Sequence, residues 1–142
     1  MARVRVPLNA ESLLTFMIKD VRPSPEALFP TYANLIVFAA SVGFDAKKFD
    51  RAPSFMKANP EPIDVEVFRN RGLYSFLQML TIAHEEGHET TSNDDRMAEV
   101  IEGYASAGFG IMKKWYDETG GSDPVFVQKL AGEIIQRSAA PH

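Results

Sequence analysis

The stretch MAEVIEGYASAGFGIMKKW, residues 97–115, has the clearest periodicity in the sequence. Its apolar or small residues recur at steps of three and four, which is the spacing of one face of an α-helix. They are Met97, Val100, Ile101, Tyr104, Ala105, Gly108, Ile111, Met112 and Trp115. Asn93 or Asp94 is placed to cap the start of this helix, and Gly120-Gly121 to end it. The stretch predicts a long helix with one buried face.

Three glycines, Gly103, Gly108 and Gly110, lie inside this predicted helix. Each glycine in a helix interior costs about 1 kcal/mol relative to alanine, so their presence needs a packing reason. Because glycine has no Cβ, it allows another helix to approach closely. We therefore expect a second helix to pack against this part of the chain.

The first 43 residues predict a strand followed by two helices. Arg3-Val4-Arg5-Val6 alternates with period two, which predicts a strand with arginines on one face and valines on the other. Asn9 is a plausible N-cap for a helix that continues to Ile18. A second helix is expected from about Thr31 to Val42, with Gly43 in the left-handed position that follows a helix. Its run from Leu35 to Ala40 predicts deep burial, in the domain core or between subunits.

The remainder of the chain predicts further helices. Residues 44–63 form a connecting loop with four lysine or arginine residues and three prolines, and a loop of this length is often functional or mobile. Residues 64–69 fit either a helical turn or a short strand. A helix after Gly72 places Leu73, Phe76, Leu77 and Leu80 on one side, and Asp123-Pro124 begins a last helix. We therefore expect one mainly α-helical domain over residues 1–142, in which a short N-terminal strand precedes a helical bundle. It divides into a strand–helix–helix part (1–43), the connecting loop (44–63) and a helical body (64–142).

Composition excludes several classes of protein. With 142 residues and no cysteine, the chain has no disulfide framework, thiolate zinc site, iron–sulfur cluster or catalytic thiol. The N-terminal residues lack the apolar region of a signal peptide, and the longest apolar run is too short to span a bilayer. We expect a cytoplasmic protein without membrane association.

The net charge of −4 is distributed unevenly along the chain. Residues 1–60 carry eight Lys/Arg against five Asp/Glu, whereas residues 61–142 carry seven against fourteen. A basic N-terminal part that contacts an anion, on an acidic body, fits this pattern, and so does a chance distribution of solvated charge.

The pattern His84-Glu85-Glu86-Gly87-His88 matches H-E-x-x-H, in which two histidines hold zinc and the glutamate is the general base. A small zinc-dependent metallopeptidase is therefore one alternative function. However, the residues that follow are polar, and no third ligand lies at a diagnostic spacing. We therefore favour a helix-end polar cluster, with His84 satisfied by a hydrogen bond, and we expect no metal, no cofactor and no catalytic residue.

The order strand, helix, helix in residues 1–43 resembles the ribbon–helix–helix module, whose strand side chains enter the major groove of DNA. Arg3 and Arg5 would then be DNA-binding residues, because arginine can bridge the acceptors of guanine. The apolar second helix would form the core of a homodimer. The alternative is a short edge strand with solvated arginines.

Two blocks of sequence resemble the family of DNA phosphorothioation (Dnd) system-associated protein 4. They are residues 29–44, FPTYANLIVFAASVGF, and residues 102–111, EGYASAGFGI, with a shorter match at residues 61–68. The resemblance implies an accessory protein of a bacterial phage-defence system linked to sulfur-modified DNA, without an assigned activity. We therefore expect a non-enzymatic accessory or regulatory protein that associates with DNA, either phosphorothioate-modified or not, or with other defence-system proteins. A protein-interaction adaptor without DNA binding is the remaining alternative.

Overall fold

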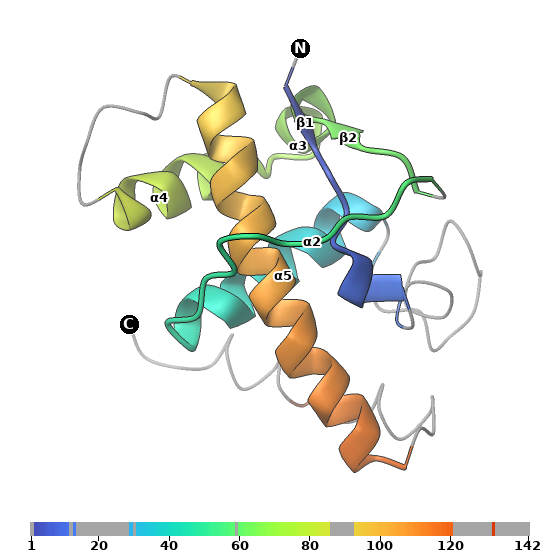
Figure 1. Ribbon diagram of the computed structural model, residues 1–142. Coiled ribbons are helices and arrows are strands. Elements are labelled where there is room, and N and C mark those ends of the chain that lie inside the picture. Colours follow the sequence, from blue (N-terminus) through green and yellow to red (C-terminus); the bar gives the residue numbers. More distant parts are fainter. Residues whose placement is uncertain are drawn as a thin grey trace.

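The computed structural model describes residues 2–11, 13, 29, 31–58, 60–85, 93–120 and 132. Within them the chain forms a short strand pair and several helices (Figure 1). In chain order these elements are β1 (Arg3–Val4), the 3-10 helix η1 (Leu8–Ala10), α2 (Tyr32–Asp45), β2 (Ile63–Asp64), α3 (Val65–Asn70), α4 (Tyr74–His84) and α5 (Asp94–Glu118). The expected mainly helical fold with a short N-terminal strand is confirmed.

The long helix predicted from the periodicity is α5, which runs through the centre of the described structure (Figure 1). Asn93 is its N-cap, and the Asn93 side chain accepts hydrogen bonds from the backbone N–H groups of Asp95 and Arg96. The chain leaves the helix at Gly120, whose φ of 70° suits a residue without a Cβ. The helix therefore begins after Asn93 and ends before Gly120, as the sequence predicts.

Helix α2 crosses α5 at very close range, as the glycines of α5 predict. A Cβ on Gly108 would overlap the carbonyl oxygen of Ala39 and lie 2.6 Å from its carbonyl carbon. Opposite, a Cβ on Gly43 would overlap the carbonyl oxygen of Tyr104. Gly103 has a different partner, because its missing side chain makes room for the ring of Phe49. Among the described residues, the nearest atom to a Cβ on Gly110 is Nδ2 of Asn9, at 3.8 Å.

The end of α2 differs from the sequence-based expectation. The helix continues past Val42 to Asp45, and Gly43 lies inside it. The left-handed residue is Lys47, with a φ of 57°. Its N–H donates to the carbonyl of Phe44 at 3.0 Å, and the next N–H, of Lys48, donates to the carbonyl of Gly43 at 2.9 Å. Gly43 was misassigned because its lack of a side chain is used for packing against α5, not for a turn.

The N-terminal strand pairs inside its own chain. β1 lies antiparallel to β2, with Arg3 opposite Asp64 and Val4 opposite Ile63. Val4 is fully buried, whereas Arg3 is exposed, so the predicted alternation of faces is confirmed. A ribbon–helix–helix module pairs strands from two subunits, and the pairing seen here is within one chain.

Asn9 is not an N-cap: it lies within η1, and its side-chain amide donates to the carbonyl of Ser106 on α5 at 2.7 Å. Most of the helix expected to follow it, through Ile18, lies outside the described residues, as does the last helix expected from Asp123.

Apolar side chains from all these elements form one core. On α2, Leu35 and Ile36 are fully buried, while Phe38 is half-buried. The apolar face of α2 packs on α5 of the same chain, so its burial does not require a second subunit. The segment expected to be either a strand or a helical turn contains both, β2 and α3.

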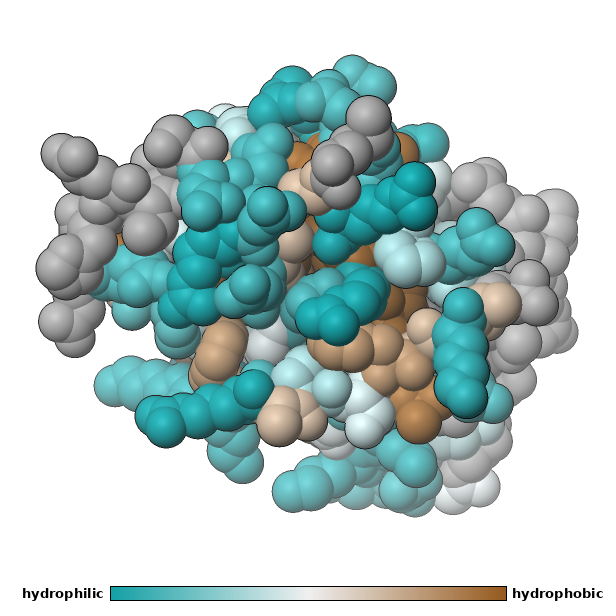
Figure 2. Space-filling view, turned by 45° about the horizontal axis from the view of Figure 1, so that its top comes forward, coloured by the Kyte–Doolittle hydropathy of each residue, from teal (hydrophilic) through white to brown (hydrophobic). Residues whose placement is uncertain are grey.

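Hydrophilic residues cover much of the face shown in Figure 2, with a smaller hydrophobic area between them. Among the described residues no helix combines the length and apolar character needed to cross a membrane.

Candidate functional site

Residues 46–58, here called the basic segment, cross over the middle of α5 (Figure 1). At one end the N–H of Asp50 donates to the carbonyl of Gly103 on α5 at 3.1 Å. At the other end the segment bonds to the N-terminal residues. The N–H of Met56 donates to the carbonyl of Val6 at 2.8 Å, and the N–H of Leu8 donates to the carbonyl of Ser54 at 2.8 Å. The segment is therefore held to α5 in its first half and to the N-terminal residues in its second half.

The basic segment has an inner side that contacts α5. The Phe49 ring fills the space that Gly103 leaves open. The carboxylate of Asp50, the one acidic residue of the segment, accepts hydrogen bonds from the Ser106 hydroxyl at 2.7 Å and from the Ala52 N–H at 3.1 Å. This carboxylate is half-buried, so the negative charge of the segment is directed toward α5.

The outer side of the segment carries four cations, and all of them are exposed: Lys47, Lys48, Arg51 and Lys57. Within the described residues, none of them forms an ion pair with a carboxylate. Four positive charges against one inward-facing carboxylate give a local excess of positive charge on a chain whose net charge is −4. This surface can attract a polyanion.

Arg5, one of the two arginines singled out in the sequence, lies beside the basic segment and is ion-paired. Its side chain bonds Glu102 through Nε and Nη2, each at 3.0 Å, and its backbone N–H donates to the same carboxylate at 2.6 Å. Glu102 is buried on α5, whereas the Arg5 side chain is 51% exposed. The hydrogen bond to Glu102 raises the pKa of Arg5. The guanidinium also lies 3.8 Å from the centre of the Phe55 ring, a cation–π contact.

Arg3 and Arg5 therefore differ in their surroundings. Arg3 is exposed on β1 and makes no ion pair within the described residues. Arg5 compensates a buried carboxylate and links β1, α5 and the basic segment. The strand alternation in the sequence identified both as outward-facing, but it carried no information about Glu102, which is 97 residues away.

The structure describes two residues of the H-E-x-x-H pattern, His84 and Glu85, and both contact side chains of α5. His84 is the last residue of α4, and its Nδ1 lies 2.8 Å from the hydroxyl of Tyr104. Glu85 forms an ion pair with Arg96 of α5. His84 is thus satisfied by a hydrogen bond, as expected, whereas His88 lies outside the described residues. Among the described residues no group of three or more His, Asp or Glu side chains is arranged to hold a metal ion.

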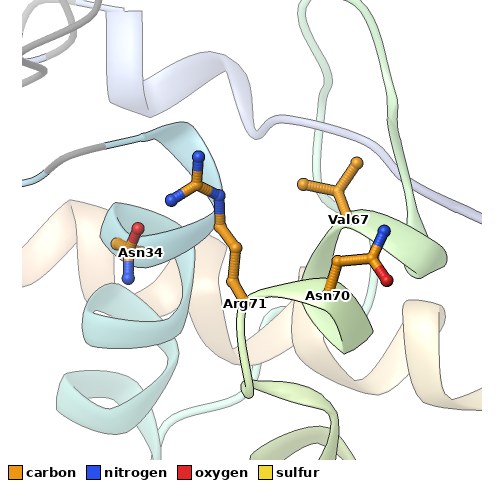
Figure 3. Close-up of a pocket in the computed structure, with 4 residues that line it drawn as sticks. All are labelled: Asn34, Val67, Asn70 and Arg71. Carbon is orange, nitrogen blue, oxygen red and sulfur yellow. The ribbon is translucent and has the colours of Figure 1, made fainter.

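A shallow cavity of about 540 Å³ lies at the other end of α2, lined by Asn34, Val67, Asn70 and Arg71. Figure 3 shows the Arg71 side chain extending from the end of α3 toward the first turns of α2, which carry Asn34. Three of the lining residues are exposed: Val67, Asn70 and Arg71. Arg71 is the one cationic side chain of this lining. This region provides a reference surface, away from the basic segment, against which the segment can be tested.

Sequence reasoning noted the four cations of residues 44–63 but assigned the segment only as a loop. The signal that could have identified its two sides is the placement of Phe49, Asp50 and Phe55 between the cations. Those three side chains contact α5 or Arg5, and this is what leaves the cations outside.

Comparison with known proteins gives one match. The sequence profile of the family described as DNA sulphur modification system-associated protein 4 matches residues 3–128. Neither the curated proteins nor the solved structures include one that matches the chain significantly.

Proposed function

The chain belongs to the family of DNA sulphur modification system-associated protein 4, and from this membership we propose that it is a non-enzymatic accessory protein that binds DNA through its basic segment. The family name associates the chain with a DNA sulphur modification system. Binding to DNA, a regulatory role in phage defence, a cytoplasmic location and a homodimeric state are parts of the proposal.

The observation that carries the proposal is the division of charge across the basic segment. Its cations are exposed, and its one carboxylate is bonded to Ser106 on the inner side. Lys and Arg side chains that contact phosphates release counterions, and this supplies the sequence-independent part of DNA affinity. The exposed edge of Arg5 adjoins this surface, because its guanidinium lies over the Phe55 ring, and Arg3 is exposed two residues before it.

A non-enzymatic role is supported by the engagement of the acid–base groups around the segment. His84 is bonded to Tyr104, Glu85 to Arg96 and Glu102 to Arg5. Each of these three groups has a partner within the protein, whereas a general acid or base must reach a proton of the substrate. In this proposal the contacts of His84, Glu85 and Glu102 stabilise the fold.

The test is a titration of a fluorescently labelled 20-base-pair duplex, plain or with phosphorothioate linkages, at several salt concentrations. We expect binding that weakens as salt rises. Arg51→Gln removes one phosphate contact, so the slope of log affinity against log salt should become shallower by about 0.9. The matched control is Arg71→Gln, the same change on the surface of Figure 3, which should leave the slope unchanged.

Two results would contradict the proposal. Absence of binding to either duplex at low salt would favour an adaptor that contacts only proteins. An equal effect of Arg71→Gln and Arg51→Gln would show that the basic segment is not the binding surface. Analytical ultracentrifugation of the protein, free and DNA-bound, gives its mass and so tests the proposed homodimer.

A further inference from the structure

An aromatic cavity lies where the basic segment leaves α2. Its volume is about 340 Å³, and its lining residues are Phe44, Asp45, Lys47, Phe49 and Tyr104. They come from the end of α2, the start of the basic segment and the middle of α5. The volume lies within the range of sites that hold small organic molecules, about 300–1,000 Å³.

The inner rings of this cavity are held in fixed positions. The ring of Phe49 packs edge-on to Tyr104 with the ring centres 4.8 Å apart, and it lies 4.5 Å from the His84 ring. The hydroxyl of Tyr104 is 2.8 Å from Nδ1 of His84, and the Phe49 ring occupies the space where a Cβ on Gly103 would lie. These rings therefore form a preorganised wall.

The outer ring is exposed. Phe44 packs against the edge of Tyr104 at a centre-to-centre distance of 5.4 Å, yet 41% of the residue remains accessible to solvent. An exposed phenylalanine at the end of a helix presents a flat apolar surface next to the cavity.

The rim of the cavity is basic and is fixed by an unusual backbone conformation. Lys47 has a φ of 57°, which is unfavourable for a residue with a Cβ by about 1–2 kcal/mol. The same conformation ends α2, because the N–H groups of Lys47 and Lys48 bond to the carbonyls of Phe44 and Gly43. The conformation places two exposed cations, Lys47 and Lys48, directly after Phe44 and Asp45.

We propose that this cavity binds an unstacked nucleobase, with the neighbouring phosphates on Lys47 and Lys48. The proposal rests on the proposed DNA binding and adds its preference: single-stranded or locally opened DNA over a closed duplex. Flat aromatic side chains beside a basic surface are the combination that single-strand binders use, since bases stack on the rings while cations follow the backbone. In a closed duplex the faces of the bases are covered by their neighbours.

The experiment compares three labelled probes: a 12-nucleotide single strand of deoxythymidine, an abasic strand with the same number of phosphates, and a 12-base-pair duplex. We expect the thymidine strand to bind the wild-type protein at least about fivefold more tightly than the abasic strand, because stacking of one base contributes that much or more. The two strands carry the same phosphates, so the difference reports the base.

Phe44→Ala should remove most of this preference without changing affinity for the abasic strand, and Phe44→Trp should restore it. The control is Val67→Ala, which removes an exposed apolar side chain at the cavity of Figure 3. Thermal melting checks that each variant is folded. If Phe44→Ala does not fold, two measurements still test the base-binding site. They are the wild-type comparison of thymidine and abasic strands and the same comparison with Phe44→Trp.

Equal, salt-dependent affinity of the wild-type protein for the thymidine and abasic strands would overturn the base-binding site and leave the proposed function intact. A tighter complex with the duplex than with the thymidine strand would also overturn it. Absence of binding to all three probes would instead overturn the proposed function.

Discussion

Gly108→Ala should destabilise the protein, whereas the same substitution two residues later, Gly110→Ala, should stabilise it. Both glycines lie in the interior of α5, so both gain the helix propensity of alanine. They differ in what a new Cβ would contact. At Gly108 it would overlap the backbone carbonyl of Ala39 on α2, whereas at Gly110 the nearest atom of the described residues is Asn9 Nδ2 at 3.8 Å.

The magnitude follows from two opposing contributions. Alanine is better than glycine in a helix interior by about 1 kcal/mol, and overpacking a core costs about 1–3 kcal/mol. The overlap at Gly108 is with backbone, which cannot rotate away as a side chain can, so the cost lies at or beyond the upper end of that range. We therefore expect a net loss of about 2 kcal/mol for Gly108→Ala and a gain of up to about 1 kcal/mol for Gly110→Ala.

Thermal melting followed by circular dichroism measures both variants. At about 2–4 °C per kcal/mol, the scale for domains slightly larger than this one, Gly108→Ala should melt about 6 °C below the wild-type protein and Gly110→Ala up to about 3 °C above it. Urea titration gives the free energies of unfolding. A melting temperature of Gly108→Ala equal to or above the wild-type value would refute the close crossing of α2 and α5. So would an equal loss of stability in both variants.

Three further changes test other parts of the structure. Arg5→Ala should lower the free energy of unfolding by about 2 kcal/mol. This is below the range for breaking a fully buried ion pair, because Arg5 is half-exposed. Arg3→Ala should change the free energy of unfolding by no more than about 0.5 kcal/mol, and equal effects would contradict the difference between the two arginines. Lys47→Gly should raise the free energy of unfolding by about 1 kcal/mol, because glycine adopts the left-handed conformation without the steric cost of a Cβ. The same change should lower DNA affinity. Loss of stability would show that this conformation is not strained. Leu35→Ala should cost about 2–5 kcal/mol, whereas Met79→Ala, at a site 69% exposed, should change little in the same urea titration.

The sequence by itself determined the long helix α5 and the outward and inward faces of β1. The steps of three and four in residues 97–115 specify α5, because only a helix brings those side chains to one face. Asn93 and Gly120 fix its two ends through local backbone chemistry. The alternation of Arg3 to Val6 likewise specifies which side of β1 is buried. All of these are properties of neighbouring residues, so a single sequence contains them.

Only the tertiary structure decided which distant residues meet. Gly43 was expected to end α2, but it lies inside the helix, at a position where α5 leaves no room for a side chain. Arg5 was expected to face outward and to bind DNA, and in the structure it neutralises Glu102 on a helix that begins far along the chain. The loop expected at residues 44–63 has an inner and an outer side, because Phe49 packs against Gly103 of α5 and the Ser106 hydroxyl donates to Asp50. Each of these contacts depends on how α2, α5 and the N-terminal strand cross in space, and no local pattern of residues encodes that crossing.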